Sequence, residues 1–241
     1  MIASLAWYPA ARTGWDSLWR GIREDLGFGP SDLTWPDDFA RHWRDPDLLL
    51  AMTCALPMQQ GLADSVHVVG SPVWDVPGLP PGQYASHIVT RPDDTRALAD
   101  VAADGLAVNG CDSQSGYGTL VTAGLVMGPG DVVETGSHAA SMDAVASGAA
   151  GLAAIDVVTW ALAPRSDLSI RATTPPTPAC PFITARADWV APLRQAITRA
   201  IARQSPRDRA ATRLVGLTSL DPEAYATCRN APHCNREDSA A

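Results

Sequence analysis

The chain contains no lysine, since all 18 of its basic residues are arginine. This absence excludes a pyridoxal Schiff base, a phosphate-loop lysine and a lysine nucleophile. The sequence also has no run of about eighteen apolar residues, so no membrane-spanning helix and no direct membrane insertion is expected. With a formal net charge of −8 and no basic cluster, the 241-residue chain is not expected to bind nucleic acid or anionic lipid.

Signals for export, cofactors and metals are also missing. No basic segment, apolar core and cleavage site precede the first expected strand. The chain as written is therefore expected in the cytoplasm, and in the periplasm if an upstream leader exists. No nucleotide loop is present, and Cys228 and Cys234, with His233 between them, fit no common zinc spacing. We therefore expect no cofactor and no metal site, while the odd number of 5 cysteines leaves at least one thiol unpaired.

The most informative segment is a polar turn between an expected strand, Gly105–Val108, and an expected helix, Thr119–Leu125. The turn contains Ser113, Gln114, Ser115 and Gly116. The first N–H groups of a helix lack internal partners, so these donors, the helix dipole and the serine hydroxyls suit an anion. The alternative is that Asp112 or Ser113 only caps the helix.

Two further expected strands end in polar groups. Ser137 and His138 follow the strand expected at 131–134, and the apolar strand 152–156 ends in Asp156. Ligands of open α/β sheets bind beyond the carboxyl ends of the strands, so three such ends predict one shared site. Alternatively, His138 packs at the start of its own helix and Asp156 is the N-cap of the helix Val157–Leu162, a role that does not exclude ligand binding.

Several motifs give the chain a resemblance to a known family. The segments "DSQSGY", "TGSHAASMDAVASGAAGLAAIDVVTW" and "TPPTPACPFIT", with Ser4–Pro9 and Leu48–Cys54, resemble the phosphate, phosphite and phosphonate binding proteins of ABC importers. The resemblance extends to about Ala202. It implies a type II periplasmic-binding-protein fold, in which two α/β lobes hold a ligand in the cleft between them.

This fold implies a discontinuous first lobe, residues 1–86 plus 184–241, and an inserted second lobe, residues 87–183. The chain is expected to cross between the lobes near 84–91 and 180–186. Apolar spacing predicts helices at Trp15–Leu26 and Trp189–Gln204. Strands are expected at Ile2–Tyr8 and Leu33–Trp35, and a loop at 71–83.

The resemblance also implies roles for the candidate residues. Ser113, Ser115 and the N–H groups from Gln114 to Gly116 would hold a tetrahedral oxyanion, with Ser137 beside them. His138 would donate to the same anion, and Asp156 would accept from an amine or hydroxyl of the ligand. The first lobe would contribute Tyr8, Thr53 and Cys54, and Arg91 is the best candidate for an arginine in the cleft.

The sequence departs from the family pattern at two places. Gln114 stands where members typically have threonine, and Ala179-Cys180 stands where they tend to have glycine and leucine. A sulfonate, a carboxylate or an amine-containing metabolite therefore remains open as the ligand.

The resulting hypothesis is a non-enzymatic, monomeric solute-binding protein that captures a small oxyanion such as phosphate or a phosphonate for an ABC permease. The alternative is a cytoplasmic enzyme or ligand-sensing module on the same scaffold. In an enzyme, His138, Asp156 and Cys54 would be the acid–base or nucleophile candidates.

Overall fold

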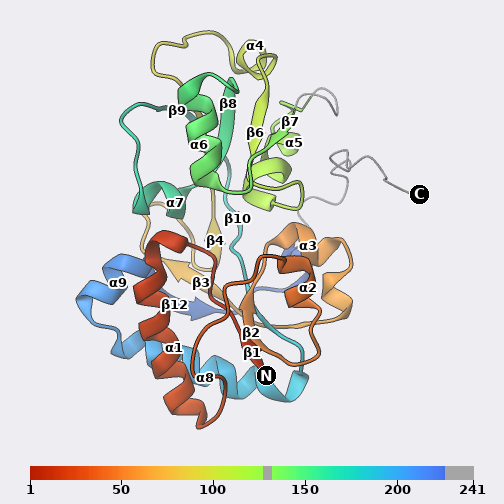
Figure 1. The fold of residues 1–241 in the computed structure, drawn as a ribbon, viewed down its shortest axis with the longest axis vertical. Coiled ribbons are helices and arrows are strands. Elements are labelled where there is room, and N and C mark those ends of the chain that lie inside the picture. Colours follow the sequence, from red (N-terminus) through yellow and green to blue (C-terminus); the bar gives the residue numbers. More distant parts are fainter. Residues whose placement is uncertain (127–131, 226–241) are drawn as a thin grey trace. The chain divides into compact units, whose positions relative to one another are not determined.

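The computed structural model describes residues 1–126 and 132–225, and its contacts divide the chain into two units (Figure 1). Unit 1 contains Met1–Tyr84 and the described residues from Thr177 onward, and unit 2 contains Ala85–Pro176. The lobe boundaries predicted from the sequence, after residues 86 and 183, differ from these by a few residues. Each unit is built on a five-stranded sheet with helices packed against it.

Unit 1 has a mixed sheet in the order β1-β2-β11-β3-β12 and a small two-stranded ladder, β10-β4. Its strands are β1 (Ile2–Ala3), β2 (Leu48–Met52), β3 (His67–Trp74), β4 (Gln83–Tyr84), β10 (Thr177–Pro178), β11 (Phe182–Thr184) and β12 (Leu214–Thr218). Its α-helices are α1 (Arg12–Leu26), α2 (Phe39–Trp43), α3 (Ala55–Gln59), α8 (Val190–Arg203) and α9 (Pro206–Thr212). Short 3-10 turns are η1 (Pro9–Ala11), η2 (Leu62–Asp64), η5 (Ala187–Trp189) and η6 (Pro222–Tyr225).

The two long helices of unit 1 form where apolar residues recur every three or four positions. In α1 the buried side chains include Trp15, Leu18 and Ile22, and in α8 they include Leu193 and Ile197. The two helices pack against each other, and α8 also contacts β3 and β12 (Figure 1). Both helices predicted from the sequence are therefore confirmed, because their apolar stripes coincide with the buried faces.

Three local predictions for unit 1 are wrong. The first strand ends at Ala3 rather than Tyr8, because only Ile2 and Ala3 pair with β2. The segment 33–35 is not a strand, and Thr34 N makes only one backbone hydrogen bond there, to Ala3 O at 2.7 Å. The predicted loop 71–83 begins only after Trp74, because β12 pairs with β3 as far as Trp74.

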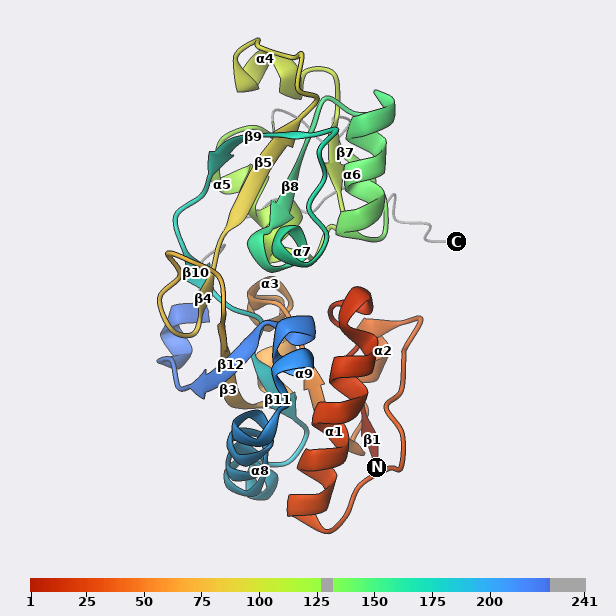
Figure 2. The same cartoon turned by 90° about the vertical axis from the view of Figure 1, so that its left-hand side faces the viewer.

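Unit 2 has its sheet in the order β7-β6-β8-β5-β9 (Figure 2). Its strands are β5 (Ser86–Thr90), β6 (Leu106–Val108), β7 (Val132–Glu134), β8 (Leu152–Asp156) and β9 (Ser169–Thr173). Its helical segments are α4 (Leu98–Ala102), the turn η3 (Gln114–Gly118), α5 (Thr119–Thr122), α6 (His138–Ser147) and α7 (Val157–Leu162). Residue 131, which was assigned to a strand from the sequence, lies outside the described residues.

Helix α6 covers the sheet of unit 2 through Met142 and Val145, which pack in one buried cluster with Val89, Ala107 and Ala153 (Figure 2). Two of these strand residues are alanines, and their small side chains let the helix lie close to the sheet. Because α6 is held there, its first residue is fixed at the edge of the sheet where β6 and β8 end.

Candidate functional site

Three strands of unit 2 bring their polar ends to one edge of the sheet. β6 pairs in parallel with both β7 and β8, so the carboxyl ends of these three strands point the same way. Ser113 and Ser115 follow β6, Ser137 and His138 follow β7, and Asp156 is the last residue of β8. The structure therefore brings to this edge the predicted site residues that follow the three strands, which are Ser113, Ser115, Ser137, His138 and Asp156.

The serine turn, which we define as Ser113–Gly118, is organised by the side chain and the carbonyl of its first residue. Ser113 Oγ accepts from Gly116 N at 3.1 Å, and Ser113 O accepts from Gly118 N at 2.9 Å. Ser113 is thus an N-cap, as the simpler sequence interpretation proposed. The hydroxyls of Ser113 and Ser115 lie 3.5 Å apart, and Gln114 is buried with its carbonyl accepting from Thr119 Oγ1 at 3.0 Å.

Gly116 is required by close packing within this turn. A Cβ built on Gly116 would overlap the side-chain oxygen of Asn109 and would lie 3.3 Å from Ser113 Oγ. Asn109 Oδ1 is itself buried without a hydrogen-bond partner among the described residues. Any side chain at position 116 must therefore displace Asn109 or Ser113, and with it the turn.

His138 lies between the serine turn and Asp156. Ser137 caps α6 by accepting from Ala140 N at 3.1 Å, which makes His138 the first residue of the helix. His138 Nε2 is 2.9 Å from Ser115 Oγ and 3.3 Å from Asp156 Oδ2. The imidazole is thus placed by its own helix and contacts residues from the two neighbouring strand ends.

Burial lowers the pKa of His138 below its ordinary value, whereas the Asp156 carboxylate and the Ala154 carbonyl act to raise it. The side chain of His138 is only 11% exposed, and desolvation is the largest of these effects. The imidazole is therefore neutral at pH 7 in this structure.

Asp156 is the N-cap of α7. Its Oδ1 accepts from Val158 N at 3.0 Å and from Thr159 N at 2.9 Å, while Oδ2 accepts from the Thr159 hydroxyl and lies near His138. Its side chain is 3% exposed. The capping interpretation is therefore confirmed, and both carboxylate oxygens already make interactions within unit 2.

Sequence reasoning missed Ser86, the first residue of β5. Its hydroxyl donates to Ser115 O at 2.8 Å, and its backbone is paired with Asp156. Because β5 runs antiparallel to β8, its amino end reaches the edge where β8 finishes. In the sequence, the only sign of a role for Ser86 in the site was its polar side chain near the start of the expected crossing strand, 84–91.

Arg91 does not lie among these residues. Its Nη1 donates to the carbonyls of Val145 at 3.2 Å and Ala150 at 3.3 Å, close to the carboxyl end of α6. A cation is favourable there because the last carbonyls of a helix lack internal partners. The suggestion that Arg91 faces a ligand is therefore wrong.

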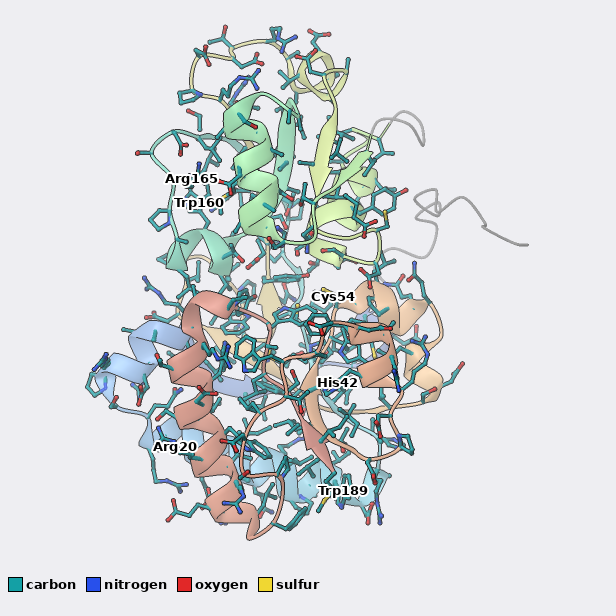
Figure 3. The ribbon with its side chains drawn as sticks, viewed as in Figure 1. Arg20, His42, Cys54, Trp160, Arg165 and Trp189 are labelled. Carbon is teal, nitrogen blue, oxygen red and sulfur yellow. The ribbon has the colours of Figure 1, made fainter. Side chains whose placement is uncertain are left out.

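The three candidates from the first lobe are buried in unit 1. The Tyr8 ring packs edge-on against Trp74 at a centroid distance of 5.4 Å. Thr53 N donates to Pro181 O at 3.1 Å, whereas its hydroxyl is buried without a partner among the described residues. Cys54 is the residue before α3 (Figure 3).

Metal-binding groups and membrane-spanning helices are both absent from residues 1–126 and 132–225. No group of three or more histidine, cysteine, aspartate or glutamate side chains there could hold a metal ion. None of the helices in the same ranges is long and apolar enough to cross a membrane. The pair Cys228 and Cys234, with His233, lies outside the described residues.

The sequence matches a protein-family model described as "ABC transporter, phosphonate, periplasmic substrate-binding protein" over residues 61–225. The chain belongs to this family. The family resemblance predicted from the sequence is thereby confirmed, and the family is one of periplasmic substrate-binding proteins rather than enzymes. No curated protein is similar enough in sequence to count as a match.

Several solved structures share the fold of this chain. PhnD1 from Prochlorococcus marinus, in complex with methylphosphonate, aligns with a TM-score of 0.71 at 14% identity, covering 93% of each chain. A binding protein component of a phosphonate ABC transporter from Pseudomonas aeruginosa has a TM-score of 0.71 at 14% identity, covering 90% of this chain and 79% of its own. A Xanthomonas citri protein bound to ATP has a TM-score of 0.67 at 16% identity, covering 95% and 96%. The predicted two-lobed α/β fold of type II periplasmic-binding proteins is thus confirmed.

Proposed function

We propose that this member of the phosphonate-binding family captures a small oxyanion, phosphate or a phosphonate, at the serine turn of unit 2. It would work in the periplasm and pass this ligand to the permease of an ABC importer. The observation that carries the proposal is the convergence of Ser115, His138 and Asp156 from three parallel strand ends. The family match and the Prochlorococcus marinus relative bound to methylphosphonate support the class of ligand.

The residues around the serine turn are of the types that bind oxyanions. Hydroxyl groups, backbone N–H groups at the start of a helical segment and an imidazole can all donate to a tetrahedral anion. Gln114 would contribute its backbone N–H group, as the sequence implied. In unit 1, the buried hydroxyl of Thr53 supports its proposed role, and Tyr8 and Cys54 are retained as candidates.

The geometry favours binding over catalysis. In a Ser-His-Asp triad, the serine and the carboxylate contact opposite nitrogens of the imidazole, so that one nitrogen takes a proton while the carboxylate holds the other. Here Ser115 Oγ and Asp156 Oδ2 both lie against Nε2. Asp156 cannot orient His138 as a general base for Ser115 in this arrangement, so we propose that the protein is not an enzyme.

The direct test is thermal unfolding with phosphate, phosphite, sulfate, methylphosphonate, aminophosphonates and sulfonates. A ligand at a hundred times its dissociation constant should stabilise the protein by about 2.7 kcal/mol, which raises Tm by several degrees. We expect this shift with phosphate or a phosphonate, and we expect Ser115→Ala to remove it. The matched control is Ser147→Ala, which replaces an exposed serine on α6 that bonds only to its own helix.

Two outcomes would contradict this proposal. If none of these anions shifts Tm, the serine turn does not bind oxyanions. If an anion shifts Tm equally in wild type, Ser115→Ala and Ser147→Ala, it binds elsewhere on the chain.

The lowered pKa of His138 predicts proton uptake on binding. An anion near Nε2 stabilises the imidazolium, so binding should raise the pKa of His138, and affinity should increase as pH falls from about 8 towards 6. The stability of the free protein should change with pH in the opposite direction to the affinity. A buried neutral histidine contributes to the free energy of unfolding above its unfolded pKa of about 6.5, and this contribution is lost as pH falls.

Calorimetry in buffers of different ionisation enthalpy measures this proton uptake. His138→Gln keeps an N–H donor near the Nε2 position but cannot be protonated. The number of protons that this variant takes up on binding should therefore fall to the number taken up by the ligand itself. Equal uptake in wild type and His138→Gln would show that His138 does not titrate with binding. His42 of unit 1 is the matched control, because burial also lowers its pKa while the carboxylate that acts to raise it is that of Asp45.

A further inference from the structure

Two cysteines of unit 1 that are far apart in sequence face each other in its interior. Cys54 Sγ and Cys180 Sγ are 3.7 Å apart, although 126 positions separate the two residues. Neither cysteine is part of a disulfide, and their exposed fractions are 4% and 1%. This pair lies outside the serine turn, and of the two only Cys54 is among the candidates for ligand binding.

The strand register of unit 1 brings the two cysteines opposite one another. β11 pairs antiparallel with β2, with Phe182 opposite Met52. Thr53 N donates to Pro181 O at 3.1 Å, which continues the ladder by one residue on each strand. One further step along both strands places Cys54 opposite Cys180.

This position suits a disulfide. Residues directly opposite in an antiparallel pair have Cα atoms about 4.5 to 5.5 Å apart, and disulfides join Cα atoms about 4.4 to 6.8 Å apart. The two sulfur atoms already face each other, so a rotation of the side chains would close the remaining distance. The backbone of β2 and β11 would not need to separate or shift register.

The surroundings do not favour a metal site. Among the described residues, no third cysteine, histidine or carboxylate joins the pair to make a metal-binding group. The neighbouring phenol of Tyr225 is hydrogen-bonded to Ser71 Oγ, and burial raises the pKa of Tyr225 with a smaller contribution from Cys180. The pair is therefore two buried thiols that belong to no metal-binding group of the described residues.

We propose that Cys54 and Cys180 are a redox pair that forms an intramolecular disulfide in an oxidising compartment. The bond would connect the end of β2 to the chain three residues after Thr177, where unit 1 resumes. It would close a covalent loop that contains the whole of unit 2. The buried pair would thus fix the start of β11 independently of any ligand.

The reaction balances with a disulfide oxidant, either a small molecule or a protein. The thiolate of Cys54, the more exposed of the two, attacks the oxidant's disulfide, forms a mixed disulfide and releases one thiol. The thiolate of Cys180 then attacks Cys54 Sγ and releases the second thiol. Overall, two S–H bonds are lost, one S–S bond forms, and two electrons and two protons reduce the oxidant to two thiols.

The test uses the full chain, first reduced with a phosphine and then incubated with oxidised glutathione. The protein is quenched in acid, alkylated in denaturant and digested, and the peptides are analysed by mass spectrometry. We expect the peptides of Cys54 and Cys180 to be linked, and the link to disappear on treatment with dithiothreitol. Oxidation should also raise Tm by about 5 to 10 °C, because a long loop is closed in the unfolded chain.

Single variants separate this bond from reactions of the other three cysteines. In Cys54→Ala and Cys180→Ala, the same oxidation should give no linked peptide at either position. It should also raise Tm by about 5 to 10 °C less than in the wild type, because the disulfide of Cys111 can still form in these variants. Three outcomes would overturn the proposal. Cys54 and Cys180 could both be alkylated after oxidation, they could carry glutathione without a link, or either could be linked to a different cysteine. Oxyanion binding in the Ser115→Ala and Ser147→Ala variants is measured separately, so either proposal can fail alone.

Discussion

Replacing Gly116 with alanine is expected to weaken oxyanion binding by about 100-fold or more. The added Cβ overlaps Asn109 Oδ1 and crowds Ser113 Oγ, so the serine turn must open. Each donor that loses its alignment with a charged ligand costs about 1.5 to 3 kcal/mol, and the turn presents several donors. Overpacking adds about 1 to 3 kcal/mol of lost stability in unit 2.

Isothermal titration with methylphosphonate or phosphate, whichever shifts Tm in the wild type, measures this loss. Gly216→Ala is the matched control, because a Cβ there would lie 3.4 Å from Val73 Cβ, an ordinary contact, in the other unit. We expect Gly216→Ala to keep wild-type affinity. Wild-type affinity in Gly116→Ala would instead mean that the anion does not depend on the shape of this turn.

Replacing Asp156 with alanine is expected to destabilise unit 2 by about 3 kcal/mol. The change removes the N-cap of α7 and leaves three donors without their acceptor, namely the buried N–H group of Val158 and the half-buried N–H group and hydroxyl of Thr159. Loss of a cap costs about 0.5 to 2 kcal/mol, and donors left unpaired cost about 1 to 3 kcal/mol. Asp156→Asn keeps one carbonyl oxygen for the cap and should cost only about 1 kcal/mol.

Unfolding of unit 2 can be followed at Trp160, the only tryptophan between Ala85 and Pro176, which lies in α7 (Figure 3). Fluorine NMR of the fluorotryptophan-labelled protein during urea unfolding resolves this probe from those of unit 1. Asp143→Ala is the control, because the exposed Asp143–Arg165 ion pair should contribute at most about 1 kcal/mol. If Asp156→Ala unfolds at the same urea concentration as Asp143→Ala, the carboxylate is not the stabilising cap that its hydrogen bonds indicate.

The elements that the sequence predicted correctly are those set by local patterns. The helices α1 and α8 follow apolar spacing within one segment. Helix α7 begins directly after Asp156, because an aspartate side chain reaches the N–H groups two and three residues ahead. The shared edge of the site followed from a general rule for parallel strands, which needs only the order of strands and helices along the chain.

The elements that the sequence missed depend on partners far away in the chain. β3 continues to Trp74 only because β12, about 140 positions later, pairs with it. Ser86 reaches the serine turn because β5 is antiparallel to β8, and strand direction cannot be read from one strand's own residues. Arg91 was misplaced for the same reason, since the helix end that it caps is determined by how α6 packs on the sheet.

The sheet order of unit 1 has a consequence for folding during synthesis on the ribosome. β11 lies between β2 and β3, yet it is synthesised after the stretch Ala85–Pro176 of unit 2. This stretch carries all five strands of the unit 2 sheet and can begin to fold once Pro176 has emerged. The first half of unit 1 must wait beside it with its central strand missing, and the exposed edges of β2 and β3 are then open to pairing with other chains. The sheet of unit 2 can therefore form before the sheet of unit 1 is complete. Pairing of β11 with β2 and β3 is a late step in the folding of unit 1.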